Sequence, residues 1–369
     1  MDNVLILGGY GNFGKRIAAA LARSHVPVII AGRNEQKAQA LVDQLRQDYP
    51  ATSIDKAVFD VERDLVAHLQ RLKLAVVVNT CGPFQLKQYD VAQACLRNKI
   101  HYVDLADGRD FVTGITALDD EAKAAGVWVI SGASTVPGLS SAVLEHYKKD
   151  FASMESLRFG ISPGQKAERG LATTQGILTY VGKCLKAVPG DTGSRYGWQD
   201  IYRQAYPVLG NRWMANCDIP DLDLLPARYG IGRIRFSAGM ENVLLHFAIW
   251  KLSWAVRLGL PLNLPKYAAF LLRASHWFDR FGSADGGMHM IMRGKDINGK
   301  SIERRWFIVA LHGDGPQIPC VPAIVLARKL ASGALPGAGA APCVGMVTLQ
   351  EYLAELKPFA VKTYEDNGH

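Results

Sequence analysis

Short apolar runs alternate with amphipathic segments over the first 135 residues of the chain. Runs rich in β-branched residues predict strands at 4–8, 26–31, 53–60, 74–80, 101–106 and 127–132. Apolar residues at helical spacing between them predict helices near 14–24, 34–48, 62–72, 87–98 and 116–125. Continuously apolar strands suit a parallel sheet covered on both faces, so this part predicts a doubly wound α/β domain.

The alternation changes after residue 140. Strand-like runs at 156–162 and 233–239, and a hairpin over 287–313, predict an antiparallel sheet in an α+β domain. The hairpin turns at Asn298-Gly299, whose residues accept the positive φ of a type I′ turn. Residues 192–230, rich in Trp, Tyr, Pro and Gly, predict long loops.

The last part of the chain is again helical in pattern. We expect helices at 321–333 and 348–357, with a loop between them, and a capping box of Thr348 and Glu351. The expected organisation is therefore a domain over 1–135, an inserted substrate or dimerisation domain over 136–314, and C-terminal helices over 315–369 that pack back on the first domain.

A tryptophan-rich stretch at 243–281 has two interpretations. Apolar residues spaced by three and four form one helical stripe, which comprises Leu244, Phe247, Trp250, Trp254 and Leu258. Lys251 and Arg257 within it argue against a membrane-spanning helix. The stretch is then either a helix pair buried in the second domain or a dimer interface, or, given its net charge of +4 by sequence, an attachment to a membrane surface.

Composition narrows the class of protein. The chain has 369 residues, is 49% hydrophobic and 21% charged, and so predicts a folded protein. Its net charge of +8 is scattered, without a nucleic-acid-binding motif. Six cysteines without a C-x-x-C pair favour reduced thiols and no metal site. Only four apolar residues precede the first glycines, which is too short for a signal peptide, so we expect a cytoplasmic protein.

The stretch "ILGGYGNFGKR" (6–16) has the spacing G-x-G-x-x-G between the first strand and the first helix. Gly9 allows a tight turn, Gly11 lets backbone approach a pyrophosphate, and Gly14 lets the helix pack on the strand. This context predicts a Rossmann dinucleotide site rather than a plain tight turn. The residues expected to contact the cofactor are Gly9, Tyr10, Gly11, Asn12, Phe13 and Gly14.

The end of the second predicted strand indicates which dinucleotide binds. An NAD site usually has an acidic residue here for the ribose 2′-hydroxyl, whereas this chain has Arg33. A guanidinium pairs with a 2′-phosphate, so we expect NADP, with NAD less favoured and with Asn34 assisting. The alternative is that Arg33 lies in a surface loop and Glu35 binds the ribose. A short-chain dehydrogenase is disfavoured because no Tyr-x-x-x-Lys pair occurs.

Three further stretches, "AGRNEQKAQAL", "NTCGPFQLKQYDVAQACLRNKIHYVDLADG" (79–108) and "VISGASTVPGLSSAVL" (129–144), resemble the saccharopine dehydrogenase-like family. The resemblance implies an NAD(P)-binding domain interrupted by a substrate domain. It also implies that Gly82, Pro83 and Phe84, next to Cys81, edge the nicotinamide-ribose pocket, and that Asp60 lies near the adenine. Core packing for Phe84 and helix capping for Asp60 remain open as alternatives.

Few residues stand out as acids or bases. Asp104 and Asp107, near a strand end, are the catalytic candidates; the alternative for Asp104 is to hold a loop by hydrogen bonds. Arg169 and Thr174, at a predicted helix start, are candidates for binding a substrate carboxylate, unless they are a solvated arginine and a helix cap.

These residues predict an NADP-dependent oxidoreductase. It would transfer a hydride to or from a C–N, C–O or conjugated C–C bond of a small molecule, as a homodimer without nucleic acid. Two alternatives remain: a non-catalytic NADP-binding regulatory protein, and a lipid-directed reductase at a membrane surface.

Overall fold

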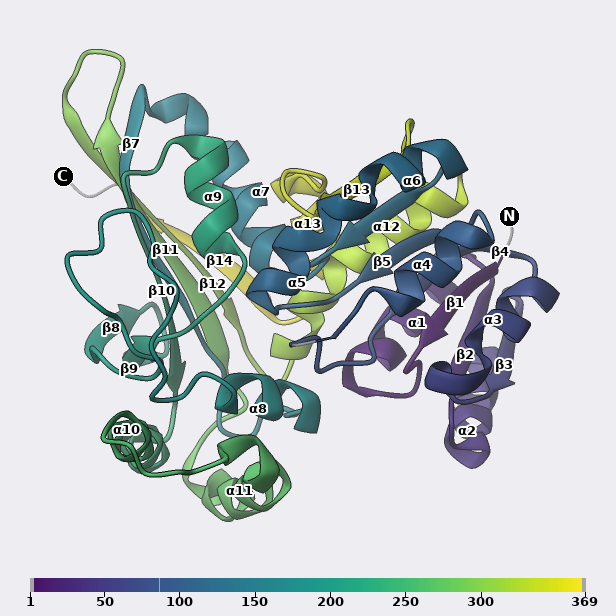
Figure 1. Cartoon of the computed structure of the whole chain (residues 1–369), viewed down its shortest axis with the longest axis horizontal. Helices are drawn as coiled ribbons and strands as arrows, with labels where there is room; N and C mark the ends of the chain where they lie inside the picture. The colour runs from purple at the N-terminus through teal and green to yellow at the C-terminus, as the bar shows by residue number, and fades with distance from the viewer. Residues whose placement is uncertain (1–2, 86, 367–369) are drawn as a thin grey trace. The chain divides into compact units, whose positions relative to one another are not determined.

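The computed structural model describes residues 3–85 and 87–366, which divide into two compact units. The first unit consists of Met1–Ala142 and Gln317–Glu355, and the second of Val143–Pro316 and Leu356–His369. The chain thus leaves the first unit once, returns to it, and ends in the second (Figure 1).

The first unit is built on seven parallel strands in the order β13-β6-β5-β4-β1-β2-β3. The order of its first six strands is that of a Rossmann fold, which confirms the predicted fold class. The strands are β1 (Asn3–Leu7), β2 (Val28–Gly32), β3 (Ile54–Val58), β4 (Leu74–Asn79), β5 (His101–Asp104), β6 (Trp128–Ser131) and β13 (Gly339–Pro342).

Strand β13 corrects an expectation, because its residues lie in the stretch predicted to be a loop. Its sequence, GAAP, has no β-branched residue, and pairing with β6 makes it a strand. Asp119 holds it by accepting the Ala340 N–H at 2.9 Å.

Helices cover the sheet of the first unit through their apolar sides (Figure 1). In α1, for example, Ile17, Ala18 and Leu21 are buried. The helices are α1 (Asn12–Arg23), α2 (Glu35–Asp48), α3 (Val61–Arg71), α4 (Asp90–Arg97), α5 (Arg109–Thr113), α6 (Asp119–Ala125), α12 (Val321–Ala331) and α13 (Leu349–Leu356). The capping box at the start of α13 is present: Thr348 Oγ1 accepts the Glu351 N–H, and the Glu351 carboxylate accepts the Thr348 N–H.

The second unit contains a seven-stranded mixed sheet in the order β14-β12-β11-β7-β10-β9-β8. Its strands are β7 (Ser153–Ser162), β8 (Tyr202–Tyr206), β9 (Gly210–Asn216), β10 (Arg233–Met240), β11 (Gly286–Lys295), β12 (Ser301–Ala310) and β14 (Val361–Asp366). All pairs are antiparallel except β7 with β10, which is parallel.

Four expectations for this unit were wrong. The predicted loops at 192–230 contain β8, β9 and α9 (Asp221–Tyr229), and the sheet is not wholly antiparallel. The expected C-terminal helices end at Leu356, after which β14 pairs with β12. The hairpin of β11 and β12 is confirmed but not its turn type: Gly299 has φ +76°, whereas Asn298 has no positive φ. Asp296 Oδ1 instead accepts the N–H groups of Asn298 and Lys300.

The tryptophan-rich stretch forms α10 (Val243–Arg257), a 3₁₀ turn (Leu264–Tyr267), α11 (Ala268–Ser275) and a second 3₁₀ segment (His276–Phe281). The buried residues of α10 are two polar ones, His246 and Ser253. Leu244, Trp254 and Leu258 of the predicted stripe are exposed. Trp250 of the stripe packs against a buried cluster, so the stripe is buried in the second unit only in part, and the dimer-interface and membrane-surface interpretations stay predictions. The remaining helices of the unit are α7 (Ser140–Tyr147), which begins in the first unit, and α8 (Leu171–Leu178).

Candidate functional site: a dinucleotide cradle in the first unit

The glycine loop between β1 and α1 has no room for a side chain at Gly9 or Gly14. Gly8 has φ +72°, and its carbonyl accepts the Gly11 N–H at 2.8 Å. A Cβ on Gly14 would lie 2.3 Å from the Gly8 oxygen and 2.8 Å from the Gly9 Cα. Only glycine at 14 therefore lets α1 begin directly against the loop.

Helix α1 begins without a side-chain cap. Its N-cap residue is Gly11, which makes no capping hydrogen bond through a side chain, and its first turn contains no acidic residue. The first N–H groups of an α-helix have no partner within the helix, and the helix dipole adds partial positive charge there. This helix start therefore fits the pyrophosphate of a dinucleotide.

Tyr10 connects this loop with the end of β2. A Cβ on Gly32 would lie 2.4 Å from Tyr10 Cε1, so the tyrosine ring packs directly on the Gly32 backbone. The Tyr10 hydroxyl accepts the Asn34 N–H at 2.9 Å. The sequence placed Tyr10 in the site only as a member of the loop; its role in fixing the end of β2 needed the structure.

Arg33 is the exposed residue between these two contacts. Within residues 3–85 and 87–366 it has neither a hydrogen-bond nor an ion-pair partner, so its guanidinium is available to an anion. Asn34 caps α2 by accepting the Lys37 N–H at 2.9 Å. Glu35, the residue considered for an NAD ribose, pairs with Lys56 at 2.7 Å. The environment at the end of β2 thus fits a 2′-phosphate better than a 2′-hydroxyl.

The loop after β4 lies at the same edge of the sheet as the glycine loop. Thr80 Oγ1 donates to the Leu7 carbonyl at 2.8 Å, and Asn79 Oδ1 accepts the Cys81 N–H at 3.0 Å. Desolvation raises the pKa of the Cys81 thiol, Arg33 lowers it, and Asp60 raises it, so Arg33 and Asp60 both lie within electrostatic reach of Cys81. The structure thus gathers Arg33, Asp60 and Cys81 at one edge.

The structure shows the core packing considered for Phe84 and the helix capping considered for Asp60. Phe84 is buried and its ring centroid lies 5.4 Å from that of Phe111, so it packs in the core. Asp60 caps α3 by accepting the Glu62 N–H at 3.0 Å. Gly82 and Pro83, partly exposed, precede Phe84 in the loop. Contacts of these four residues with a cofactor remain predictions.

Asp104 is completely buried at the end of β5. Its Oδ1 accepts hydrogen bonds from the N–H groups of Ala106 (2.9 Å) and Gly132 (2.8 Å) and from the Ser131 hydroxyl (2.9 Å). Burial raises its pKa to about 6, although these hydrogen bonds act in the opposite direction. Asp104 therefore holds the loops after β5 and β6 together, which is the structural alternative considered from the sequence, and its burial gives no support to direct contact with a substrate.

Asp107 is the better acid–base candidate, because it is only half-buried. Its Oδ1 accepts a hydrogen bond from Gln85 Nε2 at 3.0 Å, and Gln85 follows Phe84 in the loop after β4. Burial raises the pKa of the Asp107 carboxyl, and the Gln85 hydrogen bond lowers it in part. The sequence did not single out Gln85, since its partner lies in another loop.

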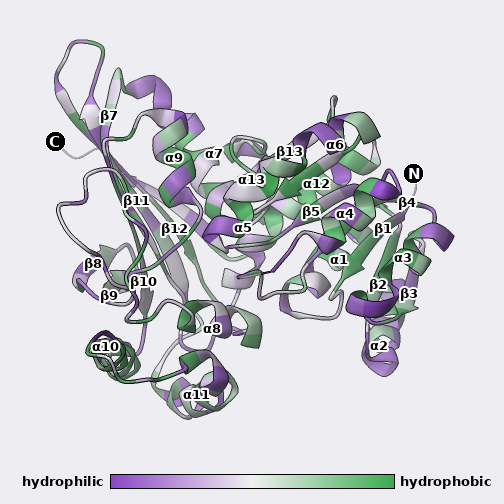
Figure 2. Ribbon diagram, in the orientation of Figure 1, coloured by the Kyte–Doolittle hydropathy of each residue, from purple (hydrophilic) through white to green (hydrophobic). Residues whose placement is uncertain are grey.

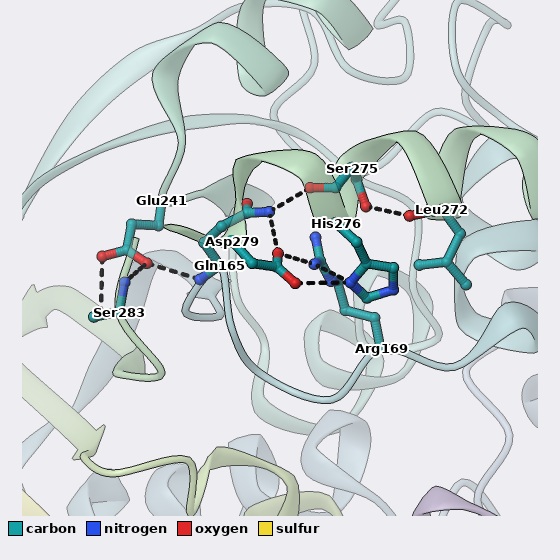
Figure 3. A network of polar contacts seen from close by, with 8 residues as sticks. All are labelled: Gln165, Arg169, Glu241, Leu272, Ser275, His276, Asp279 and Ser283. Carbon is teal, nitrogen blue, oxygen red and sulfur yellow. Dashed lines mark hydrogen bonds and ion pairs between the residues drawn. The ribbon is translucent and has the colours of Figure 1, made fainter. Parts of the chain in front are cut away.

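Arg169 and Thr174 lie in the second unit and do not form an open carboxylate site. Arg169 pairs with Asp279 at 2.6 Å, and Asp279 also accepts hydrogen bonds from His276 and Gln165 (Figure 3). The Thr174 hydroxyl donates to the Gly170 carbonyl at 3.1 Å, near the start of α8. The cation expected for a substrate is therefore already neutralised, and Thr174 bonds to its own helix.

The same network includes Glu241, which the sequence did not indicate. Its carboxylate accepts the N–H groups of Gln165 (2.7 Å) and Ser283 (2.9 Å) and the Ser283 hydroxyl (Figure 3). It also pairs with Arg212 at 3.2 Å. Glu241 thus connects β9, the loop before α8 and the loop before β11.

Neither a metal site nor a membrane-spanning helix is found in the described part of the chain. No group of three or more His, Cys, Asp or Glu side chains is placed to hold a metal among residues 3–85 and 87–366. Across these same residues, no helix is both long and apolar enough to cross a bilayer.

The fold and the glycine loop define the first unit as a Rossmann domain that binds a dinucleotide. Residues 4–130 match the family described as the saccharopine dehydrogenase NADP binding domain. The resemblance to the saccharopine dehydrogenase-like family is therefore confirmed for residues 4–130, which match its NADP-binding domain.

Solved structures extend the likeness to the whole fold. Apo saccharopine dehydrogenase (L-Glu forming) from Saccharomyces cerevisiae matches with a TM-score of 0.67 at 14% identity, over 99% of this chain and 100% of that chain. The WlbA dehydrogenase from Thermus thermophilus, solved with NAD and alpha-ketoglutarate, matches more weakly, with a TM-score of 0.40 at 11% identity over 91% of this chain and 90% of that chain. No curated protein sequence matches the chain.

Proposed function

We propose that the protein is an NADP-dependent oxidoreductase that transfers a hydride to or from a C–N, C–O or conjugated C–C bond of a small metabolite. The NADP-binding domain belongs to a family of oxidoreductases, and the fold is shared with saccharopine dehydrogenase from yeast. Bound NADP supplies the hydride chemistry itself. The protein contributes binding, orientation and one proton.

The residues of the first unit divide these tasks. The start of α1 and the loop from Gly9 to Gly14 hold the pyrophosphate, and Arg33 with Asn34 holds the 2′-phosphate. The loop after β4 borders the nicotinamide end. Asp107 donates or accepts the proton, because it is partly exposed, oriented by Gln85, and has a raised pKa.

One observation carries the choice of cofactor. Arg33 is an exposed guanidinium without a protein partner in the described chain, on a loop that Tyr10 fixes through the Asn34 N–H. A guanidinium in this position gains a charge-assisted pair only when the ribose carries a phosphate.

Titration of NADPH and NADH against the wild type and Arg33→Ala tests this assignment. We expect the variant to lose about 10- to 100-fold in NADPH affinity, the range expected when one charge-assisted contact is lost, with little change for NADH. Arg71→Ala, an exposed arginine at the end of α3, is the matched control. Tyr10→Phe keeps the ring on Gly32 and should weaken NADPH binding by a smaller factor. Equal losses for both cofactors would contradict the role of Arg33.

Turnover is tested separately, with NADPH oxidation measured on carbonyl, imine and enoyl compounds. Asp107→Asn should lower kcat, remove one limb of the pH profile, and leave NADPH affinity unchanged. Tight NADPH binding without turnover on any compound would instead support the non-catalytic regulatory alternative.

A further inference from the structure

Exposed apolar side chains are concentrated in one segment of the second unit. Of the fifteen large hydrophobic residues that are exposed in the described chain, ten lie within residues 243–281. We call this set the apolar surface; it comprises Val243, Leu244, Trp254, Leu258, Leu260, Leu262, Tyr267, Phe270, Trp277 and Phe281. Scattered exposed apolar residues are normal, but such a concentration marks an interaction surface.

The orientation of α10 supports the same conclusion. Its buried residues are His246 and Ser253, while Leu244 is 70% exposed and Leu258, which follows its last residue, is 78% exposed. A surface helix in water normally has the opposite arrangement, with its apolar side against the core. Figure 2 shows α10 largely in the hydrophobic colour, and in Figure 1 α10 and α11 lie at the same end of the second unit. The helix is thus arranged for an apolar medium on its outer side.

The segment is anchored to the unit from its inner side. Ile249, Trp250 and Val256 of α10 and Leu271 of α11 pack against a buried cluster that includes Trp198 and Leu264. A Cβ on Gly182 would lie 2.3 Å from the Ser253 oxygen, so α10 lies directly on the backbone there. The outward direction of the exposed residues is therefore fixed by packing.

The charges of the segment identify the kind of partner. It contains five cations, namely Lys251, Arg257, Lys266, Arg273 and Arg280. None of the five has an ion-pair partner in the part of the chain that the structure describes. The single acidic residue, Asp279, is paired with Arg169. Elsewhere in the same unit most arginines are paired, as Arg228 is with Glu145 and Arg304 with Asp150. The apolar surface therefore has an unneutralised positive charge.

We propose that the apolar surface binds the face of an anionic lipid bilayer, with α10 and α11 lying in the interface rather than crossing it. Apolar side chains would enter the acyl boundary while the cations contact anionic headgroups. Trp254, Tyr267 and Trp277 are of the aromatic types that prefer the bilayer interface. A second copy of the chain fits less well, because a two-fold contact between identical cationic surfaces brings like charges together.

Sedimentation with vesicles tests the proposal on the full chain. We expect the wild type to bind vesicles of phosphatidylcholine with about 30% phosphatidylserine at least about tenfold more strongly than vesicles of phosphatidylcholine alone. Leu258→Glu combined with Trp277→Glu, both 78% exposed, should reduce binding to the anionic vesicles at least tenfold. Lys251→Gln combined with Lys266→Gln should reduce the preference for anionic lipid, by roughly fivefold for each charge removed.

The chain offers a matched control for the glutamate variants. Val208 and Ile297 are also exposed apolar residues of the second unit, at 69% and 83%, but lie outside the apolar surface. Val208→Glu combined with Ile297→Glu should bind vesicles as the wild type does. Near-UV circular dichroism, to which the tryptophans of the second unit contribute, checks that all variants are folded. NADPH affinity, a property of the first unit, is independent of the lipid result.

Three results would overturn the proposal. The first is a wild type that stays in the supernatant with both kinds of vesicle. The second is an equal loss of binding in the Val208 and Ile297 control. The third is a dimer in sedimentation velocity that Leu258→Glu with Trp277→Glu disrupts, without any vesicle binding, since the surface would then be an interface between two copies.

Discussion

Helices α12 and α10 are both strongly apolar, yet α12 buries apolar residues and α10 buries polar ones. In α12 the buried residues include Val321, Ile324 and Leu326, as expected for a helix that packs on a sheet. In α10 only His246 and Ser253 are buried. Apolar composition alone therefore did not determine burial. The apolar side chains of α12 complete the core of the first unit, whereas the second unit leaves apolar side chains of α10 exposed.

The largest expected effect concerns the most tightly packed part of the first unit. Gly14→Val should lower NADPH affinity by more than about 100-fold, because its Cβ would lie 2.3 Å from the Gly8 oxygen and push α1 away from the loop. Isothermal titration with NADPH measures the loss. Gly193→Ala, where an added Cβ meets nothing within 4 Å, is the control and should bind normally. Normal NADPH binding by Gly14→Val would show that the loop is not the pyrophosphate site.

The next effect concerns Asp104, a buried carboxyl group that accepts three hydrogen bonds. Its pKa is raised from 3.8 to about 6 in the folded protein, so the folded state binds more protons than the unfolded state between these values. The contribution of Asp104 to the free energy of unfolding is therefore largest below about pH 4. It decreases by about 3 kcal/mol in total as the pH rises through about 6.

Asp104→Asn removes this titration but keeps an oxygen that accepts the same hydrogen bonds. As the pH rises from 4 to 7, the wild type should therefore lose about 3 kcal/mol of free energy of unfolding relative to the variant. Urea unfolding at several pH values measures it. A constant difference would show that Asp104 is ionised in the folded protein well below pH 6.

The smallest effect concerns His246, the contrasting buried group in the second unit. Neither ring nitrogen has a hydrogen-bond partner in residues 3–85 and 87–366, and burial lowers its pKa to about 4. His246→Leu should raise the free energy of unfolding by about 1–2 kcal/mol at pH 7. The gain should grow as the pH falls from 6.5 toward 4, because the depressed pKa of the folded wild type then costs it stability. Destabilisation by this variant at pH 7 would contradict an orphaned imidazole.

Local patterns predicted the first unit well for a physical reason. Strands β1, β2 and β4 are continuous apolar runs that need no distant partner to be recognised, and the glycine spacing reports a steric need within one loop. Strands β8 and β9 were missed because Pro and Gly in their stretch indicate loops and outweighed the strand preference of Trp and Tyr, while pairing with β10 makes β9 a strand. Strand β13 was missed for the same reason, since only β6 makes it a strand.

In the candidate site, too, residues placed by their sequence neighbours could be predicted, whereas contacts between distant residues could not. The positions of the glycine loop and Arg33 follow from neighbours in sequence, and the sequence identified them. Arg169 was expected to bind a substrate, but its partner Asp279 is 110 residues away and no local pattern reveals the pair. The contact of Asp107 with Gln85 was hidden similarly, because two loops from different strands bring the side chains together.

The contact of Tyr10 with Gly32 and Asn34 has a consequence for engineering the cofactor preference. The tyrosine belongs to the loop that we propose to hold the pyrophosphate, and it also contacts both residues that flank Arg33, the proposed partner of the 2′-phosphate. On the proposed role of Arg33, an acidic residue in its place would still be held by the same Tyr10 contacts, so we expect NADH binding to improve little unless position 10 is redesigned together with it.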